Sequence, residues 1–380
     1  MKKFAKKDRS KMKKIGVYVH IPFCKQKCYY CDFVSFANHE AIQKEYFKEL
    51  KNEIKVFFSK NEYEISTIYI GGGTPSFVNS CFIKEILELI PQNHANEITI
   101  EVNPGTVDIN KLKGYKEAGI NRLSIGLQST QDRLLKQIGR IHNFEDFLST
   151  YNMAKDIGFD NINVDLMIGL PNQSIQDIKQ SLEIITNLEP KHISVYSLIV
   201  EENTKMADLI ARNVLQLPDE ELERNMYWYV KNYLELKDYN HYEISNFAKK
   251  GYESKHNLDC WNQEEYIGFG LAAHSYLNNT RFSNTDNLND YLNNAWKNKT
   301  IQEEQDEISK KYEYMLLGLR KIEGISIQKF KENFGENPLF IFRNELNKLV
   351  DEGLLIVEND SIKLTNKGLD LANLVWEEFV

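Results

Sequence analysis

The chain has 380 residues, of which 42% are hydrophobic and 27% charged, a composition typical of soluble globular proteins. Its 47 basic and 55 acidic residues give a net charge of −8, which argues against a nucleic-acid partner because such proteins carry a basic face. No apolar run approaches the roughly 20 residues that span a bilayer. Residues 1–14 are basic with no apolar segment behind them, so we predict a solvated N-terminal tail, no secretory signal and a cytoplasmic protein.

Six short apolar runs alternate with helical patterns through the first half of the chain. The runs are rich in β-branched residues, are bounded by Gly, Pro or Asn, and are separated by lengths that suit crossover helices. This order predicts a parallel α/β sheet, either doubly wound or closed toward a barrel. The predicted strands are residues 16–22, 65–70, 97–102, 122–127, 161–168 and 192–198.

The positions of the polar residues favour the barrel. Cysteines, glycines and amides follow successive strands, as in barrels whose sites lie at the carboxyl ends of their strands. The glycine run 71–73 lacks the G-x-G-x-x-G form of a dinucleotide-binding sheet. We therefore predict an incomplete (β/α)6 TIM-like barrel over residues 15–238.

The pattern changes after residue 238. Residues 239–305 are rich in aromatic side chains, Asn and His, and we interpret them as a connecting region with strand-like pieces. Residues 306–321 are predicted to form a helix, and residues 322–380 show the order helix, helix, hairpin, helix, so we interpret residues 306–380 as a winged-helix-like domain. The candidate recognition helix has only Arg343 and Lys348 as cations beside three acids, so we favour a small domain packed on the barrel over a DNA-binding one.

Three of the five cysteines, Cys24, Cys28 and Cys31, lie within eight residues, while Cys81 and Cys260 are isolated. An odd, clustered set in a chain without a signal predicts a metal site rather than disulfides. Zinc would need a further ligand such as His20 or His39. An iron–sulfur cluster could use three thiolates and keep one iron open to another ligand.

Cys-x₃-Cys-x₂-Cys after the first strand of such a barrel resembles the radical S-adenosylmethionine superfamily. The resemblance implies a [4Fe–4S] cluster held by these cysteines, with S-adenosylmethionine on the open iron. Gly71-Gly-Gly-Thr74-Pro75 resembles the GGGTP motif of the family, which assigns Gly72, Gly73 and Thr74 to the amino end of adenosylmethionine.

Further strings narrow the resemblance to the oxygen-independent coproporphyrinogen oxidases and the related HemW-type heme chaperones. They include Tyr18-Val-His-Ile-Pro-Phe-Cys24, Glu101-Val-Asn-Pro104, Ser124-Ile-Gly-Leu-Gln-Ser129 and Val164-Asp-Leu-Met-Ile-Gly-Leu-Pro171. By resemblance, the adenosylmethionine site is lined by Tyr18, Tyr30, Glu101, Gln128, Arg140 and Asp165. A structural alternative stays open, in which the two acids pair with Arg122 or Arg140.

Two positions bear on whether the chain is a chaperone or an oxidase. Phe33 stands where the oxidases have a fourth cysteine. His256-Asn-Leu-Asp-Cys-Trp261 resembles the His-Asn-x-x-Tyr-Trp string of the chaperones, with Cys260 in place of Tyr. Histidine is a common ligand of heme iron and Trp offers a stacking face, so we assign His256 and Trp261 to heme.

We therefore predict a heme chaperone that passes heme to heme-accepting proteins, with respiratory enzymes as candidates. The alternative is an enzyme, a coproporphyrinogen III oxidase that decarboxylates two propionates to vinyl groups. Transient membrane contact and a homodimer stay open.

Overall fold

The computed structural model describes residues 12–92 and 94–380, so most of the predicted N-terminal tail lies outside the described residues. The last residues of that segment are ordered, because Lys13 pairs with Glu265 at 2.5 Å and Lys14 opens the first strand. Among the described residues, none of the helices has the length and apolar character needed to cross a membrane.

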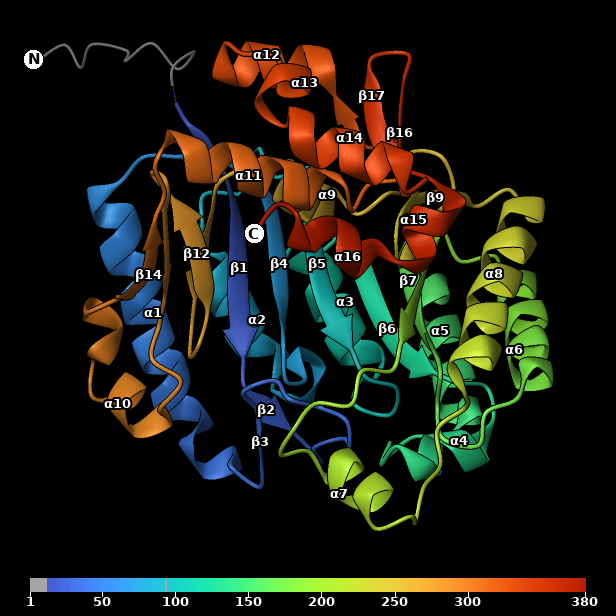
Figure 1. Ribbon diagram of the computed structural model, residues 1–380. Coiled ribbons are helices and arrows are strands. Elements are labelled where there is room, and N and C mark those ends of the chain that lie inside the picture. The colour runs from blue at the N-terminus through green and yellow to red at the C-terminus, as the bar shows by residue number, and fades with distance from the viewer. Residues whose placement is uncertain (1–11, 93) are drawn as a thin grey trace, which may run out of the picture.

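The six predicted strands form consecutive neighbours in one parallel sheet (Figure 1). Each strand pairs in parallel with the next, and β8 does not return to pair with β1, so the barrel is open, as predicted. The strands are β1 (Lys14–Ile21), β4 (Glu64–Gly72), β5 (Glu97–Val102), β6 (Arg122–Gln128), β7 (Asn161–Ile168) and β8 (His192–Ser197).

Helices cover the outer face of this sheet, because alternate strand residues are apolar and point toward them. In β1, the side chains of residues 15, 17, 19 and 21 are at most 1% exposed. Capping boxes at Asn143 and Ser174 begin two of the helices. The helices of this part are α1 (Gln43–Lys60), α2 (Ser80–Leu87), α3 (Ile109–Glu117), α4 (Asp132–Gln137), α5 (Phe144–Asp156), α6 (Ile175–Asn187), α7 (Lys205–Ala211) and α8 (Glu220–Leu236).

The aromatic and His-rich region extends the sheet at both edges. The strand β11 (Tyr266–Phe269) pairs in parallel with β1 and is followed by the antiparallel β12 (His274–Leu277), β13 (Thr280–Ser283) and β14 (Thr300–Glu304). At the other edge, β10 (Asn246–Ala248) and β9 (Asn240–Glu243) continue from β8. The sequence indicated the strand-like pieces but not their places, because partners in a sheet depend on tertiary contacts. The predicted boundaries at 238 and 305 remain predictions.

The same region contributes the helices α9 (Lys255–Trp261) and α10 (Leu288–Leu292). Short elements complete the chain before residue 305: the strands β2 (Phe23–Cys24) and β3 (Phe36–Ala37), and the single turns η2 (Glu40–Ile42), η3 (Pro75–Phe77) and η4 (Ala295–Lys297).

The C-terminal segment folds around its own apolar core, which includes Phe330 and Phe342 and is separate from the core of the sheet. It lies over the amino ends of the parallel strands, while β2 and β3 lie at the opposite end (Figure 1). Its elements follow the predicted order: α11 (Glu307–Gly318), β15 (Ile325–Ser326), α12 (Ile327–Phe334), α13 (Pro338–Ile341), α14 (Arg343–Asp351), β16 (Leu355–Glu358), β17 (Ser361–Leu364), α15 (Asn366–Asp370) and α16 (Ala372–Glu377).

Candidate functional site

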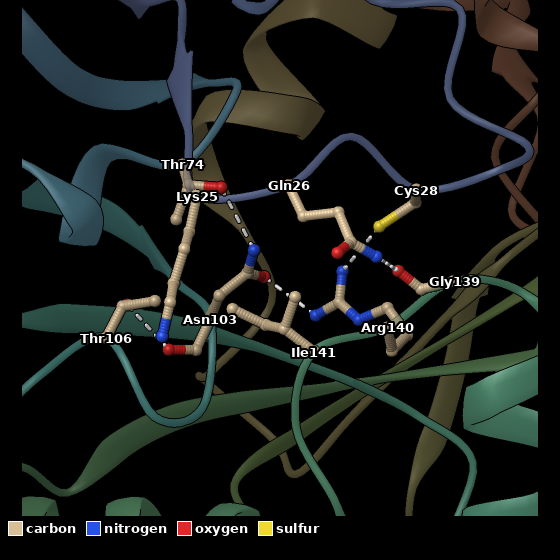
Figure 2. Close-up of a pocket in the computed structure, with 9 residues that line it drawn as sticks. All are labelled: Lys25, Gln26, Cys28, Thr74, Asn103, Thr106, Gly139, Arg140 and Ile141. Carbon is tan, nitrogen blue, oxygen red and sulfur yellow. Dashed lines mark hydrogen bonds between the residues drawn. The ribbon is translucent and has the colours of Figure 1, made fainter. Parts of the chain in front are cut away.

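The predicted cluster loop follows β1 at the carboxyl ends of the strands. Cys24 lies in β2, and the backbone N–H of Cys31 donates to the carbonyl of Cys28 (3.2 Å) in a tight turn. The Thr74 hydroxyl donates to the Cys24 Sγ, and the Arg140 Nη1 donates to the Cys28 Sγ, both at 3.4 Å. The loop therefore presents two of its thiols to hydrogen-bond donors from two other segments of the barrel, of which Figure 2 shows the contact between Arg140 and Cys28.

The chemistry of this donor set fits an iron–sulfur cluster better than zinc. In the described part of the chain, no three His, Cys, Asp or Glu side chains gather closely enough for a single metal ion. Both ring nitrogens of His20 already form hydrogen bonds, Nδ1 with the Tyr18 hydroxyl (3.0 Å) and Nε2 with the Val34 carbonyl (2.9 Å). Burial raises the pKa of Cys24, and it raises that of Cys31 to about 11. Burial therefore favours the neutral thiols, and a bound metal centre would favour the thiolates.

The glycine motif is required by the close approach of β4 to the cluster loop. Gly72 has a φ of +114°, and a Cβ there would lie 2.6 Å from the His20 ring. A Cβ on Gly73 would meet the Cys24 Sγ at 3.0 Å and the Phe23 nitrogen at 3.1 Å. The Gly73 N–H donates to the Ile21 carbonyl (2.9 Å), which ties the motif to the end of β1. The motif therefore lies against the cysteine loop, as the predicted cofactor site requires.

The two predicted carboxylates lie on the strands β5 and β7, which flank β6 in the sheet. Glu101 accepts hydrogen bonds from the Tyr69 hydroxyl (3.0 Å) and the Gly72 N–H (3.1 Å). Asp165 accepts from the Asn163 amide (2.6 Å). Burial raises the pKa of Glu101 to about 7, with Asp165 adding to the effect, and burial also raises the pKa of Asp165. Such shifts without a strong cationic partner are typical of functional sites.

The alternative in which these acids pair with arginines is met only at longer range: the charge of Arg122 lowers the pKa of both acids, but less than burial raises it. Arg140 gives its donors to the Cys28 Sγ, the Asn103 Oδ1 (2.8 Å) and the Gly126 carbonyl (2.6 Å). The Nε of Arg122 is buried without a hydrogen-bond partner among the described residues. Both carboxylates therefore have capacity to bind a ligand.

The remaining predicted adenosylmethionine residues lie around the same end of the barrel. Tyr18 lies beside Tyr69, and the two rings are stacked with their centres 6.3 Å apart. Tyr30 packs beside the buried apolar group that includes Leu134. Gln128 ends β6 with a φ of +73° and is 9% exposed. Their contacts to a cofactor remain predictions.

The predicted heme string lies at the other end of the barrel. His256 is buried in α9, where its Nδ1 is 2.8 Å from the Thr67 hydroxyl and its ring stacks on Tyr69 at 5.3 Å. Thr67 precedes Gly72 by five residues of β4, or roughly 16 Å along the strand. The structure therefore does not bring His256 and the cysteines together.

The neighbours of His256 in the string are covered by other side chains. The guanidinium of Arg320 lies 4.5 Å from the Trp261 ring centre and 4.6 Å from that of Trp376. Burial raises the pKa of Cys260 to about 12, which makes it a neutral thiol. One face of the predicted stacking surface is thus occupied by Arg320.

Two residues in the site were missed by the sequence analysis. Asn103 joins Thr74 and Arg140 by hydrogen bonds of 3.0 and 2.8 Å, and its signals were its place directly after β5 and within the string Glu101-Val-Asn-Pro104. Tyr69 supports Glu101 and stacks on His256. Alternation in β4 indicated its face but not its partners.

Comparison with known proteins agrees with this geometry. The model of the radical SAM superfamily matches residues 18–185, and that of the HemN C-terminal domain matches residues 308–371. The heme chaperone HemW of Bacillus subtilis is 38% identical over 374 residues, which cover 96% of this chain and 99% of that protein. HemW of Escherichia coli is 32% identical, with coverage of 97% and 99%.

The fold has a close counterpart among solved structures. Coproporphyrinogen III oxidase (HemN) from E. coli superimposes with a TM-score of 0.82 over 97% of this chain and 90% of that one, at 22% identity. At that identity the likeness establishes the fold alone, whereas the full-length identity to the chaperones establishes the family. The open barrel, the three-cysteine loop and these relatives together show that the chain belongs to the HemW heme chaperone family of the radical SAM superfamily.

Proposed function

We propose that this protein is a heme chaperone, which binds heme and delivers it to heme-accepting proteins while carrying a [4Fe–4S] cluster and S-adenosylmethionine. The observation that carries the proposal is the three-cysteine loop in a chain that matches HemW along nearly its whole length. The position that holds a fourth cysteine in the oxidases is Phe33, whose side chain is 63% exposed. We place the protein in the cytoplasm, where thiols stay reduced.

Each residue of the cofactor site has a task that its contacts support. Cys24, Cys28 and Cys31 would hold the cluster, which when bound supplies one-electron chemistry and an open iron for adenosylmethionine. Glu101 and Asp165 would bind the ammonium group or ribose hydroxyls of that cofactor, because both are half-buried acceptors on the inner face of the barrel. The backbone at Gly72 and Gly73 would allow its close approach.

His256 suits a heme ligand in its charge state. Burial lowers its pKa to about 4, so the imidazole is neutral at cytoplasmic pH and able to bind iron. The Nδ1 contact with Thr67 would orient the ring and leave Nε2 for the metal.

The position of His256 adds a requirement to this role. The residue is 7% exposed, and α9 is fastened by Glu97, which accepts from the backbone N–H of Lys255 and His256 at 3.1 and 3.2 Å. Ligation of heme by His256 therefore requires α9 to move away from β4.

The proposal is tested with anaerobically reconstituted protein. One sample receives heme, and a second receives coproporphyrinogen III with adenosylmethionine and a reductant. We expect stable heme binding without protoporphyrinogen. Catalytic decarboxylation would instead make the chain an oxidase.

Two variants, each with a matched control, localise the ligands. His256→Ala should weaken heme binding or change the Soret band, while His39→Ala, which removes an exposed histidine, should change neither. Cys28→Ala should remove the cluster absorbance, whereas Cys81→Ala at the exposed start of α2 should keep iron and sulfide at the wild-type ratio. Unchanged heme spectra and affinity in His256→Ala would mean that heme binds elsewhere.

A further inference from the structure

Asn103 occupies a central place beside the cysteine loop (Figure 2). Its side-chain amide donates to the Thr74 Oγ1 at 3.0 Å, and its Oδ1 accepts from the Arg140 Nη2 at 2.8 Å. Thr74 and Arg140 are the residues whose donors reach the sulfurs of Cys24 and Cys28. One side chain therefore connects the donors of two different cysteines.

The directions of these hydrogen bonds form a consistent chain. An asparagine NH₂ can only donate, so the Thr74 oxygen accepts from it and turns its own hydrogen toward the Cys24 Sγ. A guanidinium can only donate, so Arg140 is held by the Asn103 oxygen at one nitrogen and donates to the Cys28 Sγ from the other. The amide thus sets the orientation of both sulfur donors.

The backbone of Asn103 is itself anchored. Its N–H donates to the Ser76 hydroxyl at 3.0 Å, and Ser76 is 2.6 Å from the Thr106 hydroxyl. The ammonium of Lys111 donates to the carbonyls of Ser76 (2.8 Å) and Thr106 (2.9 Å), which fastens the η3 turn to the loop after β5. This arrangement limits the movement of Asn103 relative to the cysteine loop.

We propose that Asn103 is a positioning residue that tunes the reduction potential of the cluster by holding Thr74 and Arg140 against the sulfurs of Cys24 and Cys28. This inference rests on the cluster of the proposed function. Reduction adds one electron, and hence negative charge, to a cluster held by thiolates. Hydrogen bonds to the sulfurs stabilise the reduced state more than the oxidised state, so their loss lowers the potential.

The test is a spectroscopic redox titration of the reconstituted full-length protein. Asn103→Leu removes both side-chain hydrogen bonds at similar volume and unchanged charge. We expect a more negative midpoint potential, equivalent to a roughly three- to tenfold lower ratio of reduced to oxidised cluster at a fixed applied potential, the range expected for one lost hydrogen bond. Asn143→Ala, which removes the cap of α5 on the outside of the barrel, should leave the potential unchanged.

A double-mutant cycle shows whether Asn103 acts through Thr74. Thr74→Val alone should lower the potential, Thr74→Ser should restore it, and Asn103→Leu should shift it less in the Thr74→Val background than in the wild type. In Asn103→Ser the side chain is too short to reach both Thr74 and Arg140, so this variant should also have a more negative midpoint potential.

The outcomes separate this inference from the proposed function. Wild-type protein that cannot be reconstituted with iron and sulfide would contradict the proposed cofactor. A normal cluster with an unchanged potential in both Asn103 variants would overturn the inference alone. The inference would also be overturned if neither Asn103 variant retained a cluster under conditions in which Thr74→Val retains one. Asn103 would then be needed for the structure of the cysteine loop rather than for the reduction potential of the cluster.

Discussion

Glu101→Gln should stabilise the ligand-free fold at alkaline pH while weakening the cofactor site. Glu101 is half-buried, it accepts hydrogen bonds from Tyr69 and Gly72, and its pKa is raised from 4.5 to about 7. Glutamine has the same shape and never ionises. Its oxygen can accept from the Gly72 N–H, and its amide can donate to the Tyr69 oxygen, so both contacts are kept in altered form.

The sign and size follow from proton linkage. Below pH 4.5 the carboxyl is protonated in the folded and unfolded chains, and the residue favours neither state. Between pH 4.5 and 7 only the unfolded chain releases the proton, so folding stability falls as pH rises. The shift of about 2.5 units corresponds to up to about 3 kcal/mol above pH 7, which Gln avoids. At pH 5 the same relation leaves less than about 1 kcal/mol.

The assay is urea unfolding of the cluster-free protein at pH 5 and pH 8, followed by circular dichroism. We expect Glu101→Gln to be more stable than wild type at pH 8 and nearly equal at pH 5. Asp177→Asn is the control, and it should be less stable than wild type. Hydrogen bonds from Ser174 and Arg133 outweigh the effect of burial and lower the pKa of Asp177, so its charged form stabilises the fold. The reasoning would be refuted if Glu101→Gln and wild type had equal unfolding free energies at pH 8, or if their difference were the same at pH 5 and pH 8. In loaded protein, calorimetry should show weaker adenosylmethionine binding.

Three further predictions concern the loop, the cofactor site and the C-terminal core. Gly73→Ala places a Cβ 3.0 Å from the Cys24 sulfur and should lower the iron content after reconstitution. Gly105→Ala is the control: its Cβ meets open space, its positive φ costs about 1 kcal/mol of backbone strain, and its iron content should stay at the wild-type level. Asp165→Asn should weaken adenosylmethionine binding measured by calorimetry at unchanged iron content; unchanged affinity would exclude this carboxylate from the pocket. Phe330→Ala leaves a cavity at a fully buried position and should lower the free energy of unfolding of the C-terminal core by about 3–5 kcal/mol. Calorimetry should then show a separate unfolding transition at lower temperature, with adenosylmethionine binding retained. A single transition at lower temperature would show that the two cores unfold together.

Much of the barrel could be predicted because its signals are local. Glu97–Val102 and Asn161–Ile168 are strands within their predicted bounds, since β-branched runs bounded by turn residues carry their own period. The edge strands around Tyr266 and Phe247 could not be placed, because their partners in the sheet are distant in sequence. A short strand does not specify its neighbours by itself.

The candidate site divides in the same way. Spacing and strand order by themselves predicted that Cys24, Cys28 and Cys31 share one loop at the end of β1, because covalent connection keeps them together. Tertiary structure alone decided that Asn103 joins Thr74 to Arg140, and that His256 lies near the amino end of β4, far from the cysteines. These contacts join segments separated by 29 to 189 residues, and only assembly of the folded sheet and its loops brings such side chains within hydrogen-bonding distance.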